Sequence, residues 1–193
     1  HRGRTRRKIM KKIILSALAA FFMVSSAYAD TVRMGTEGAY PPYNFINDNG
    51  EVDGFEKDVG DMLCIRANLD CVWVINEWDS IIPNLVSGNY DTIIAGMSIT
   101  AERDEVIDFT HDYFPPSPSV YMGLSGSDVD LDGGVIAAQT STIQAGYVAE
   151  SGATLVEFAT AEETISAVQN GEADAVLADG DYLASIIAES SGE

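Results

Sequence analysis

The sequence has few basic residues, 11 Lys and Arg against 30 Asp and Glu. Seven of these basic residues lie in residues 1–29, which contain no acidic residue, so the rest of the chain carries 4 cations against 30 anions, a formal charge of −26. Such a surface repels phosphate backbones and anionic headgroups, which argues against nucleic acids and membrane surfaces as partners. The four remaining cations are Arg33, Lys57, Arg66 and Arg103. Lys57 and Arg66 are expected to be surface charges.

Cysteine and histidine are also scarce, with two of each. No Cys-x-x-Cys motif and no histidine cluster is present, so nothing supports a metal site or another cofactor. No Ser/His/Asp or Cys/His set is visible, which argues against an enzyme. Cys64 and Cys71 are seven residues apart across a predicted helix-to-strand turn. That spacing suits a local disulfide in an oxidising compartment, with two free buried thiols as the alternative.

The sequence lacks a hydrophobic run long enough for a membrane span, which needs about 20 residues. Its apolar run Ile13–Val24 follows Lys11-Lys12 and precedes the small residues that end at Ala29. This pattern predicts a signal peptide over residues 1–29, cleavage after Ala29 and a periplasmic protein, with a membrane anchor as the alternative. A methionine directly before the two lysines makes residues 1–9 candidate untranslated sequence.

The remaining 164 residues alternate between strand-like and helix-like segments, which predicts an α/β fold with a parallel sheet covered on both faces. The expected strands are 31–35, 71–75, 91–95, 107–110, 119–124, 134–138, 154–158 and 174–177. The expected helices are 55–67, 78–86, a short one capped by Thr100, 142–150, 161–169 and 181–189.

A proline-rich segment, Phe114–Pro118, interrupts this alternation and is expected to be an extended crossover between two lobes. The lobes are residues 30–117 and 118–193. In each lobe a helix ends at a glycine, Gly88 in the first and Gly171 in the second. A turn follows, and then a buried strand that begins with aspartate. No strand that returns to the first lobe is visible before the last residue, so the second lobe is expected to be incomplete.

Residues that follow the predicted strands have the chemistry of a site for a zwitterion, since ligands bind at the carboxyl ends of strands in open α/β sheets. Arg103 offers a guanidinium fork for a carboxylate. Ser141 and Thr142 offer hydroxyls and N–H groups at a helix N-terminus to the same anion. Asp179 suits an ammonium. The rings of Tyr40 and Trp78 suit the ligand's side chain.

Several motifs resemble, in order, the polar amino-acid-binding proteins of ABC importers, family 3 of the solute-binding proteins. They are Glu37–Phe45, Asp53–Asp58, Trp78–Pro83, Ser98–Arg103 and Asp108–Thr110. The resemblance covers essentially the whole chain after the signal peptide. It implies a two-lobe periplasmic binding protein of type II, which closes on one amino acid and presents it to a membrane permease. The protein would act as a monomer without a cofactor.

The resemblance also implies roles for individual residues. Arg103, helped by Ser98 and Thr142, would bind the α-carboxylate, and Asp179 would bind the α-ammonium. Tyr40 and Trp78 would enclose the side chain, and Glu37 would meet its far end. The remaining candidates are Ala95, Gly96 and Ser141. The chain departs from the family at two places. Relatives often have hydroxyl side chains at the positions of Ala95 and Gly96, and they usually have Gly-Ser or Gly-Thr at the positions of Thr140 and Ser141. The Cys64/Cys71 spacing resembles the disulfide of lysine/arginine/ornithine and histidine binders.

Each candidate also has a structural alternative. Arg103 would then be a surface helix residue, Trp78 a core residue and Glu37 one of many solvated acids. Asp179 would be a helix cap, although Asp181 fits that role better. Glu37 with two aromatics favours a basic amino acid or an opine. The other functions considered are a cyclohexadienyl-dehydratase-like enzyme with a general acid in the cleft and an extracellular sensor domain.

Overall fold

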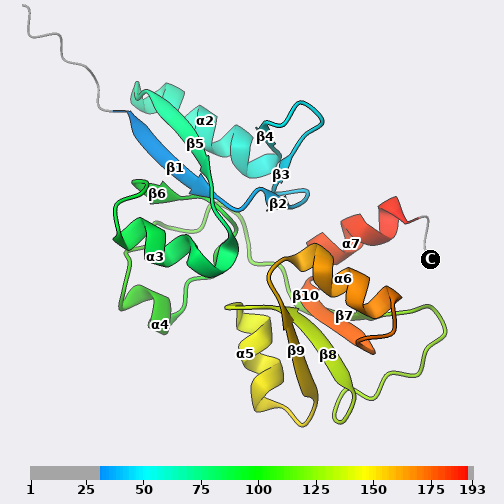
Figure 1. Cartoon of the computed structure of the whole chain (residues 1–193). Helices are drawn as coiled ribbons and strands as arrows, with labels where there is room; N and C mark the ends of the chain where they lie inside the picture. The colour runs from blue at the N-terminus through cyan, green and yellow to red at the C-terminus, as the bar shows by residue number, and fades with distance from the viewer. Residues whose placement is uncertain (1–30, 191–193) are drawn as a thin grey trace, which may run out of the picture. The chain divides into compact units, whose positions relative to one another are not determined.

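The computed structural model describes residues 31–190, so the predicted signal peptide and the cleavage site after Ala29 lie outside the described residues. These residues form strands, helices and one 3-10 helix, η1 (Figure 1). The strands are β1 (Val32–Thr36), β2 (Ala39–Tyr40), β3 (Asn44–Ile46), β4 (Val52–Asp53), β5 (Cys71–Ile75), β6 (Thr92–Ile93), β7 (Ser119–Gly123), β8 (Val135–Gln139), β9 (Thr154–Phe158) and β10 (Ala175–Asp179). The helices are α2 (Phe55–Ala67), η1 (Trp78–Ser80), α3 (Ile81–Val86), α4 (Ala101–Asp104), α5 (Ile143–Glu150), α6 (Ala161–Gln169) and α7 (Gly180–Glu189).

The first lobe is built on a parallel sheet in the order β5-β1-β6, and β2, β3 and β4 form a small antiparallel sheet beside it. The core of this lobe is a cluster around Ile81, Tyr90 and Ala95, against which the Trp78 ring packs. A Cβ at Gly35 would lie 2.7 Å from the Tyr90 ring, so β1 needs glycine where that ring crosses it. The Tyr90 hydroxyl donates to the Ile81 carbonyl at 2.5 Å, which satisfies the buried polar tip.

The second lobe has a four-stranded sheet in the order β7-β10-β8-β9. Side chains of β8 and β10 alternate between two apolar clusters, because successive strand residues point to opposite faces. Ala137 and Val176 pack with α6 and α7, whereas Ile136 and Leu177 pack with Val148 of α5. Helices therefore cover both faces of this sheet, with α5 on one side and α6 and α7 on the other (Figure 1).

The structure corrects the expectation of a parallel sheet in this lobe, because β7 runs antiparallel to β10. β7 follows an extended crossover rather than a helix, and an antiparallel edge strand on an otherwise parallel sheet is common. The small antiparallel sheet of the first lobe was also not predicted.

Other elements differ from the sequence prediction near β6 and α4. The expected strand 107–110 does not form. The N–H groups of Val106 and Ile107 both donate to the Arg103 carbonyl, so this part of the chain continues the last turn of α4. The expected strand 91–95 is reduced to β6, and the expected helix 78–86 is divided into η1 and α3.

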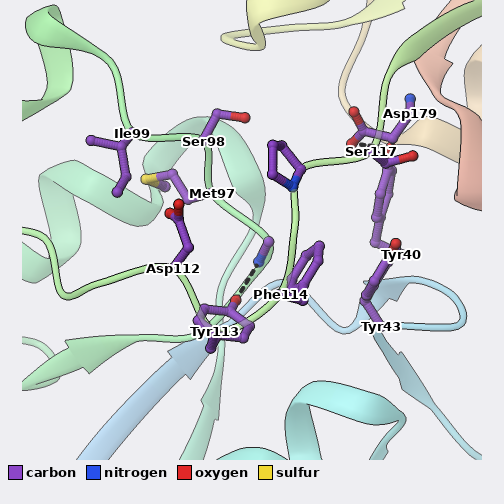
Figure 2. A pocket seen from close by; sticks show the side chains of 12 residues that line it. Tyr40, Tyr43, Met97, Ser98, Ile99, Asp112, Tyr113, Phe114, Ser117 and Asp179 are labelled. Carbon is purple, nitrogen blue, oxygen red and sulfur yellow. Dashed lines mark hydrogen bonds between the residues drawn. The ribbon is translucent and has the colours of Figure 1, made fainter.

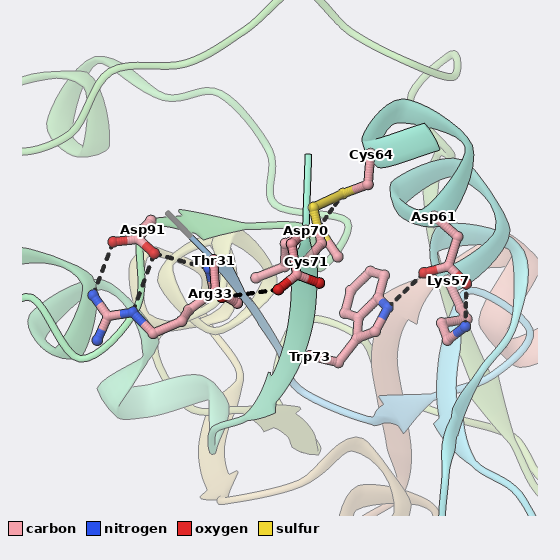
Figure 3. The surroundings of a disulfide bond; sticks show 10 residues. Thr31, Arg33, Lys57, Asp61, Cys64, Asp70, Cys71, Trp73 and Asp91 are labelled. Atoms are coloured by element: carbon pink, nitrogen blue, oxygen red, sulfur yellow. Dashed lines mark hydrogen bonds and ion pairs between the residues drawn. A yellow bond between two sulfur atoms is a disulfide. The ribbon is translucent and has the colours of Figure 1, made fainter. Parts of the chain in front are cut away.

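Helix α2 packs on the rest of the first lobe through a stripe of three buried residues spaced four apart: Glu56, Gly60 and Cys64. A Cβ at Gly60 would lie 2.6 Å from the Trp73 ring, so the helix backbone lies directly on that side chain. Cys64 forms a disulfide with Cys71 at the start of β5 (Figure 3). The predicted disulfide is thus confirmed, and it joins the end of the helix to the next strand.

Among residues 31–190, none of the helices combines the length and the apolar character needed to cross a membrane.

Candidate functional site

Segments of both lobes line one cavity, which we call the central cavity and whose volume is about 40 Å³. Most of its lining follows the carboxyl ends of β1, β6, β8 and β10, where an open α/β sheet places ligands. The lining residues are Glu37, Tyr40, Trp78, Ala95, Gly96, Ser98, Arg103, Gln139, Thr142, Ile143, Gln144 and Asp179. Nine of the ten predicted ligand-binding residues are among them, and their role in binding stays a prediction. Trp78 belongs both to this lining and to the core.

Arg103 lies on α4, where its N–H donates to the hydroxyl of the N-cap Thr100 at 3.2 Å. The guanidinium donates from Nη1 to the Ser98 carbonyl at 2.9 Å and from Nη2 to the Ser141 carbonyl at 3.1 Å. Its Cζ lies 5.5 Å from the Trp78 ring centroid. Burial lowers the pKa of Arg103, and no carboxylate of residues 31–190 lies within 4 Å of the guanidinium. A partly desolvated cation held by carbonyls and an aromatic face is complementary to an anion.

The other cations of the described chain have different surroundings. Arg33 forms an ion pair with Asp91 at 2.8 Å, and Lys57 forms one with Asp61 on α2 (Figure 3). Arg66 is exposed on α2. Arg103 is therefore the one cation of residues 31–190 in the central cavity.

Ser141 is the predicted site residue that does not line the central cavity. Its φ is 57°, and its carbonyl accepts hydrogen bonds from Arg103 and, at 3.3 Å, from Trp78 Nε1. Its hydroxyl donates to Asp79 at 2.5 Å. Ser141 therefore contacts the first lobe through its own polar atoms, rather than offering its hydroxyl to the cavity.

Thr142 is the N-cap of α5. Its hydroxyl accepts from the Ala145 N–H at 3.1 Å and donates to the Gln139 carbonyl at 2.6 Å. Because these bonds use the hydroxyl, an anion beside Thr142 would interact with Arg103 and with the N-terminus of α5.

Asp179 ends β10 and takes the N-cap position of α7, but its side chain makes no capping hydrogen bond. Asp181, the expected cap, instead lies in the first turn of α7. The Asp179 carboxylate accepts from the Tyr40 hydroxyl and from Gln144 Nε2, each at 2.9 Å. Burial raises the pKa of Asp179, and these two hydrogen bonds oppose the rise. The carboxylate is thus held across the two lobes at the cavity wall.

Glu37 follows β1, and its side chain is buried, with 8% of the residue exposed. Its Oε1 accepts a hydrogen bond from Gln139 Nε2 at 2.5 Å, and that nitrogen also donates to the Ala159 carbonyl at 3.1 Å. Burial raises the pKa of Glu37 to about 7; the Gln139 hydrogen bond opposes this, and the negative charge of Glu56 adds to it. The structure therefore excludes the alternative of a solvated surface acid.

Sequence reasoning missed three lining residues: Gln139, Ile143 and Gln144. A signal was present for the first, because Gln139 is the polar residue that ends an apolar strand, as a ligand-binding position would. Gln144 gave no comparable signal, because its role depends on the position of Asp179 in another strand.

A second cleft of about 260 Å³ adjoins the central cavity and shares Tyr40, Gly96, Ser98 and Asp179 with it. We call it the side cleft. Figure 2 shows Tyr40, Tyr43, Ser117 and Asp179 on one side of Phe114, with Met97 and Ser98 on the other side. The aromatic rings that line the side cleft include Tyr43 and Phe114, which stack with their ring centroids 5.0 Å apart.

This chain is similar to two curated periplasmic binding proteins. The octopine-binding periplasmic protein of Rhizobium meliloti is 33% identical over 90% of this chain and 69% of its own length. The lysine/arginine/ornithine-binding periplasmic protein of Escherichia coli is 32% identical over 88% of this chain and 70% of its own length.

A solved structure confirms the two-lobe α/β periplasmic binding protein fold. A periplasmic His/Glu/Gln/Arg/opine family-binding protein from Silicibacter pomeroyi, in complex with lysine, superposes with a TM-score of 0.81. It is 75% identical and covers 84% of this chain and 73% of its own. The family model of the bacterial extracellular solute-binding proteins, family 3, matches residues 32–129. The chain belongs to this family.

Proposed function

We propose that this protein captures one free basic amino acid, or an opine, outside the cytoplasm for an ABC-type importer. The observation that carries the proposal is the central cavity, where the Arg103 guanidinium shares one lining with the carboxylates of Asp179 and Glu37. A basic amino acid has the complementary charges, one carboxylate and two cationic groups.

The ligand's carboxylate would bind Arg103, which has N–H groups beyond the two that Ser98 and Ser141 accept. The α-ammonium would bind Asp179, whose two oxygens each have a second acceptor position. Tyr40 and Trp78 would contact the aliphatic part of the side chain, and Glu37 would bind its terminal cation. Ala95, Gly96 and Ser98 would contribute backbone and small side chains to the same lining.

The relatives support a basic ligand. The Silicibacter pomeroyi relative is in complex with lysine. The Rhizobium meliloti relative is named for octopine, and the Escherichia coli relative for lysine, arginine and ornithine. Membership of a solute-binding family supports binding rather than the dehydratase-like alternative.

The same relatives are periplasmic binding proteins, which supports delivery to the membrane permease of an ABC transporter. The proposal includes export by the signal peptide of residues 1–29, cleavage after Ala29 and action as a monomer that presents its closed form to the permease.

Calorimetric titration tests the ligand class. Arginine, lysine, ornithine and octopine are compared with glutamate, leucine and glutamine. We expect tight binding in the first group and binding at least about 100-fold weaker in the second, because a buried Glu37 without a cationic partner is costly. Tight binding of neutral or acidic amino acids alone would contradict the basic-ligand proposal.

The pH dependence of arginine binding is a separate prediction. The ligand's guanidinium stays charged, whereas Glu37 takes up a proton as the pH falls through about 7. The affinity should therefore be full above pH 7 and fall below it, by up to about tenfold per pH unit. In the ligand-free chain this raised pKa acts in the opposite sense, since the contribution of Glu37 to stability is lost as the pH rises from 4.5 to about 7.

Titrations with arginine from pH 5 to pH 9 measure this dependence. The variant Glu37→Gln should bind arginine more weakly at pH 9 and should not show the inflection near pH 7. An unchanged inflection in this variant would assign the titration to another group.

A further inference from the structure

Glu56 is a buried acid in the first turn of α2, and its side chain is fully inaccessible to solvent. Its Oε2 accepts a hydrogen bond from Asn44 Nδ2 at 2.6 Å. Its Oε1 accepts from the Gly96 N–H at 2.5 Å and from the Tyr113 hydroxyl. No Lys or Arg of residues 31–190 lies within 4 Å of this carboxylate. Burial raises the pKa of Glu56, and the hydrogen bonds from these neutral donors oppose the rise.

These donors come from three segments around the proposed site. Gly96 lines both the central cavity and the side cleft, and Tyr113, directly before the crossover, lines the side cleft. Asn44 continues the network, because its Oδ1 accepts from the Gly38 N–H at 2.7 Å, next to Glu37. Gly38 and Gly96 have φ values of 71° and 61°, a conformation that glycine adopts without strain, and because glycine is flexible the hydrogen bonds at their N–H groups help to fix the backbone.

We propose that Glu56 is a positioning residue for the ligand. Its carboxylate fixes the backbone at Gly96 directly and at Gly38 through Asn44, and it joins Tyr113, directly before the crossover, to both. This role rests on the proposed function, because it acts on the cavity in which the amino acid would bind.

A carboxylate suits this position better than an amide, because it accepts at both oxygens. The direction of the network is set by the Gly38 N–H, which requires Asn44 to present its oxygen to Gly38 and its NH₂ to Glu56. On the other side, the Gly96 N–H also only donates. An amide nitrogen at either position of Glu56 would face a donor, so Glu56→Gln loses at least one of these hydrogen bonds.

Glu56 also acts on Glu37 through its charge, which contributes to the raised pKa of Glu37. The other groups near Glu37 are the neutral amide of Gln139 and the Tyr182 hydroxyl, and Arg103 and Asp179 line the same cavity. Removing the charge of Glu56 leaves these groups in place. The pH midpoint of arginine binding should therefore fall in Glu56→Gln.

The experiment measures arginine affinity from pH 5 to pH 9 for the wild-type chain and for Glu56→Gln. We expect an affinity about tenfold lower at pH 8, where lost hydrogen bonds to a charged group dominate, together with a lower pH midpoint. A merely structural role would weaken binding at every pH but leave the midpoint unchanged. Asp58→Asn is the matched control, because Asp58 is an exposed acid in the same helical turn.

A second variant keeps the proposal testable if Glu56→Gln does not fold. Tyr113→Phe removes one donor to the carboxylate at a residue that is 42% exposed, and it should lower the affinity about threefold. Wild-type affinity and midpoint in both folded variants, or in Tyr113→Phe alone if Glu56→Gln does not fold, would overturn the positioning role. Failure of the wild-type chain to bind any basic amino acid or opine would overturn the proposed function itself.

Discussion

Replacing Arg103 by methionine should lower the affinity for arginine by at least about 100-fold. Truncating one partner of a buried, hydrogen-bonded charge pair costs about 2–5 kcal/mol, and each 1.4 kcal/mol is tenfold. Arg103→Lys should recover only a small part of this loss, because lysine keeps the charge without the planar fork. Isothermal titration calorimetry gives the affinities, and thermal unfolding without ligand checks the fold.

The ligand agmatine, which is arginine without its carboxylate, makes this test specific. The wild-type chain should strongly prefer arginine to agmatine, and Arg103→Met should remove most of that preference, as a double-mutant cycle requires. Arg66→Met is the control, because Arg66 is an exposed arginine of the same lobe. Retention of arginine affinity within about threefold in Arg103→Met would reject Arg103 as the carboxylate anchor.

Replacing Asp179 by asparagine should have an effect of similar size, about 100-fold. The side chain is already held by Tyr40 and Gln144, so its amide would lie in nearly the same place without its charge. The ligand's ammonium would then lose its ionic partner in a partly desolvated site. Calorimetry with arginine measures this loss directly.

The matched ligand here is 5-guanidinovaleric acid, which is arginine without its α-ammonium. Asp179→Asn should bind it about as well as the wild-type chain does, whereas arginine should lose its advantage. Asp181→Asn is the charge-matched control two residues along the chain, at an exposed position. A loss of arginine affinity in Asp181→Asn equal to that in Asp179→Asn would indicate a general charge effect.

Much of the fold was predictable because local patterns agree with it. The bounds of α2, β5, β9 and α6 are those expected from periodicity and from glycine and threonine at helix ends. Thr100 and Thr142 are the N-caps of α4 and α5. The pattern failed at residues 107–110, where alternating apolar residues resemble a strand but the backbone bonds to the preceding helix.

The site was predictable where position along the chain implies position in space. The ends of neighbouring strands meet at one edge of a sheet, so Glu37, Gly96 and Asp179 followed from the strand assignment. Contacts between distant side chains did not follow. Glu56 is one acid among 30 in the sequence, and only the fold places it against Asn44, Gly96 and Tyr113.

The stripe by which α2 lies on the first lobe has a thermodynamic consequence. Its three buried residues are a carboxylate, a glycine and a disulfide cysteine, while Met62, Leu63 and Ile65 of the same helix are exposed. Docking of this helix therefore buries little apolar side-chain surface, the kind of surface that gives unfolding its large positive heat capacity. The free energy needed to release α2 from the sheet should therefore change little on cooling. Reduction of the Cys64–Cys71 disulfide should lower it strongly.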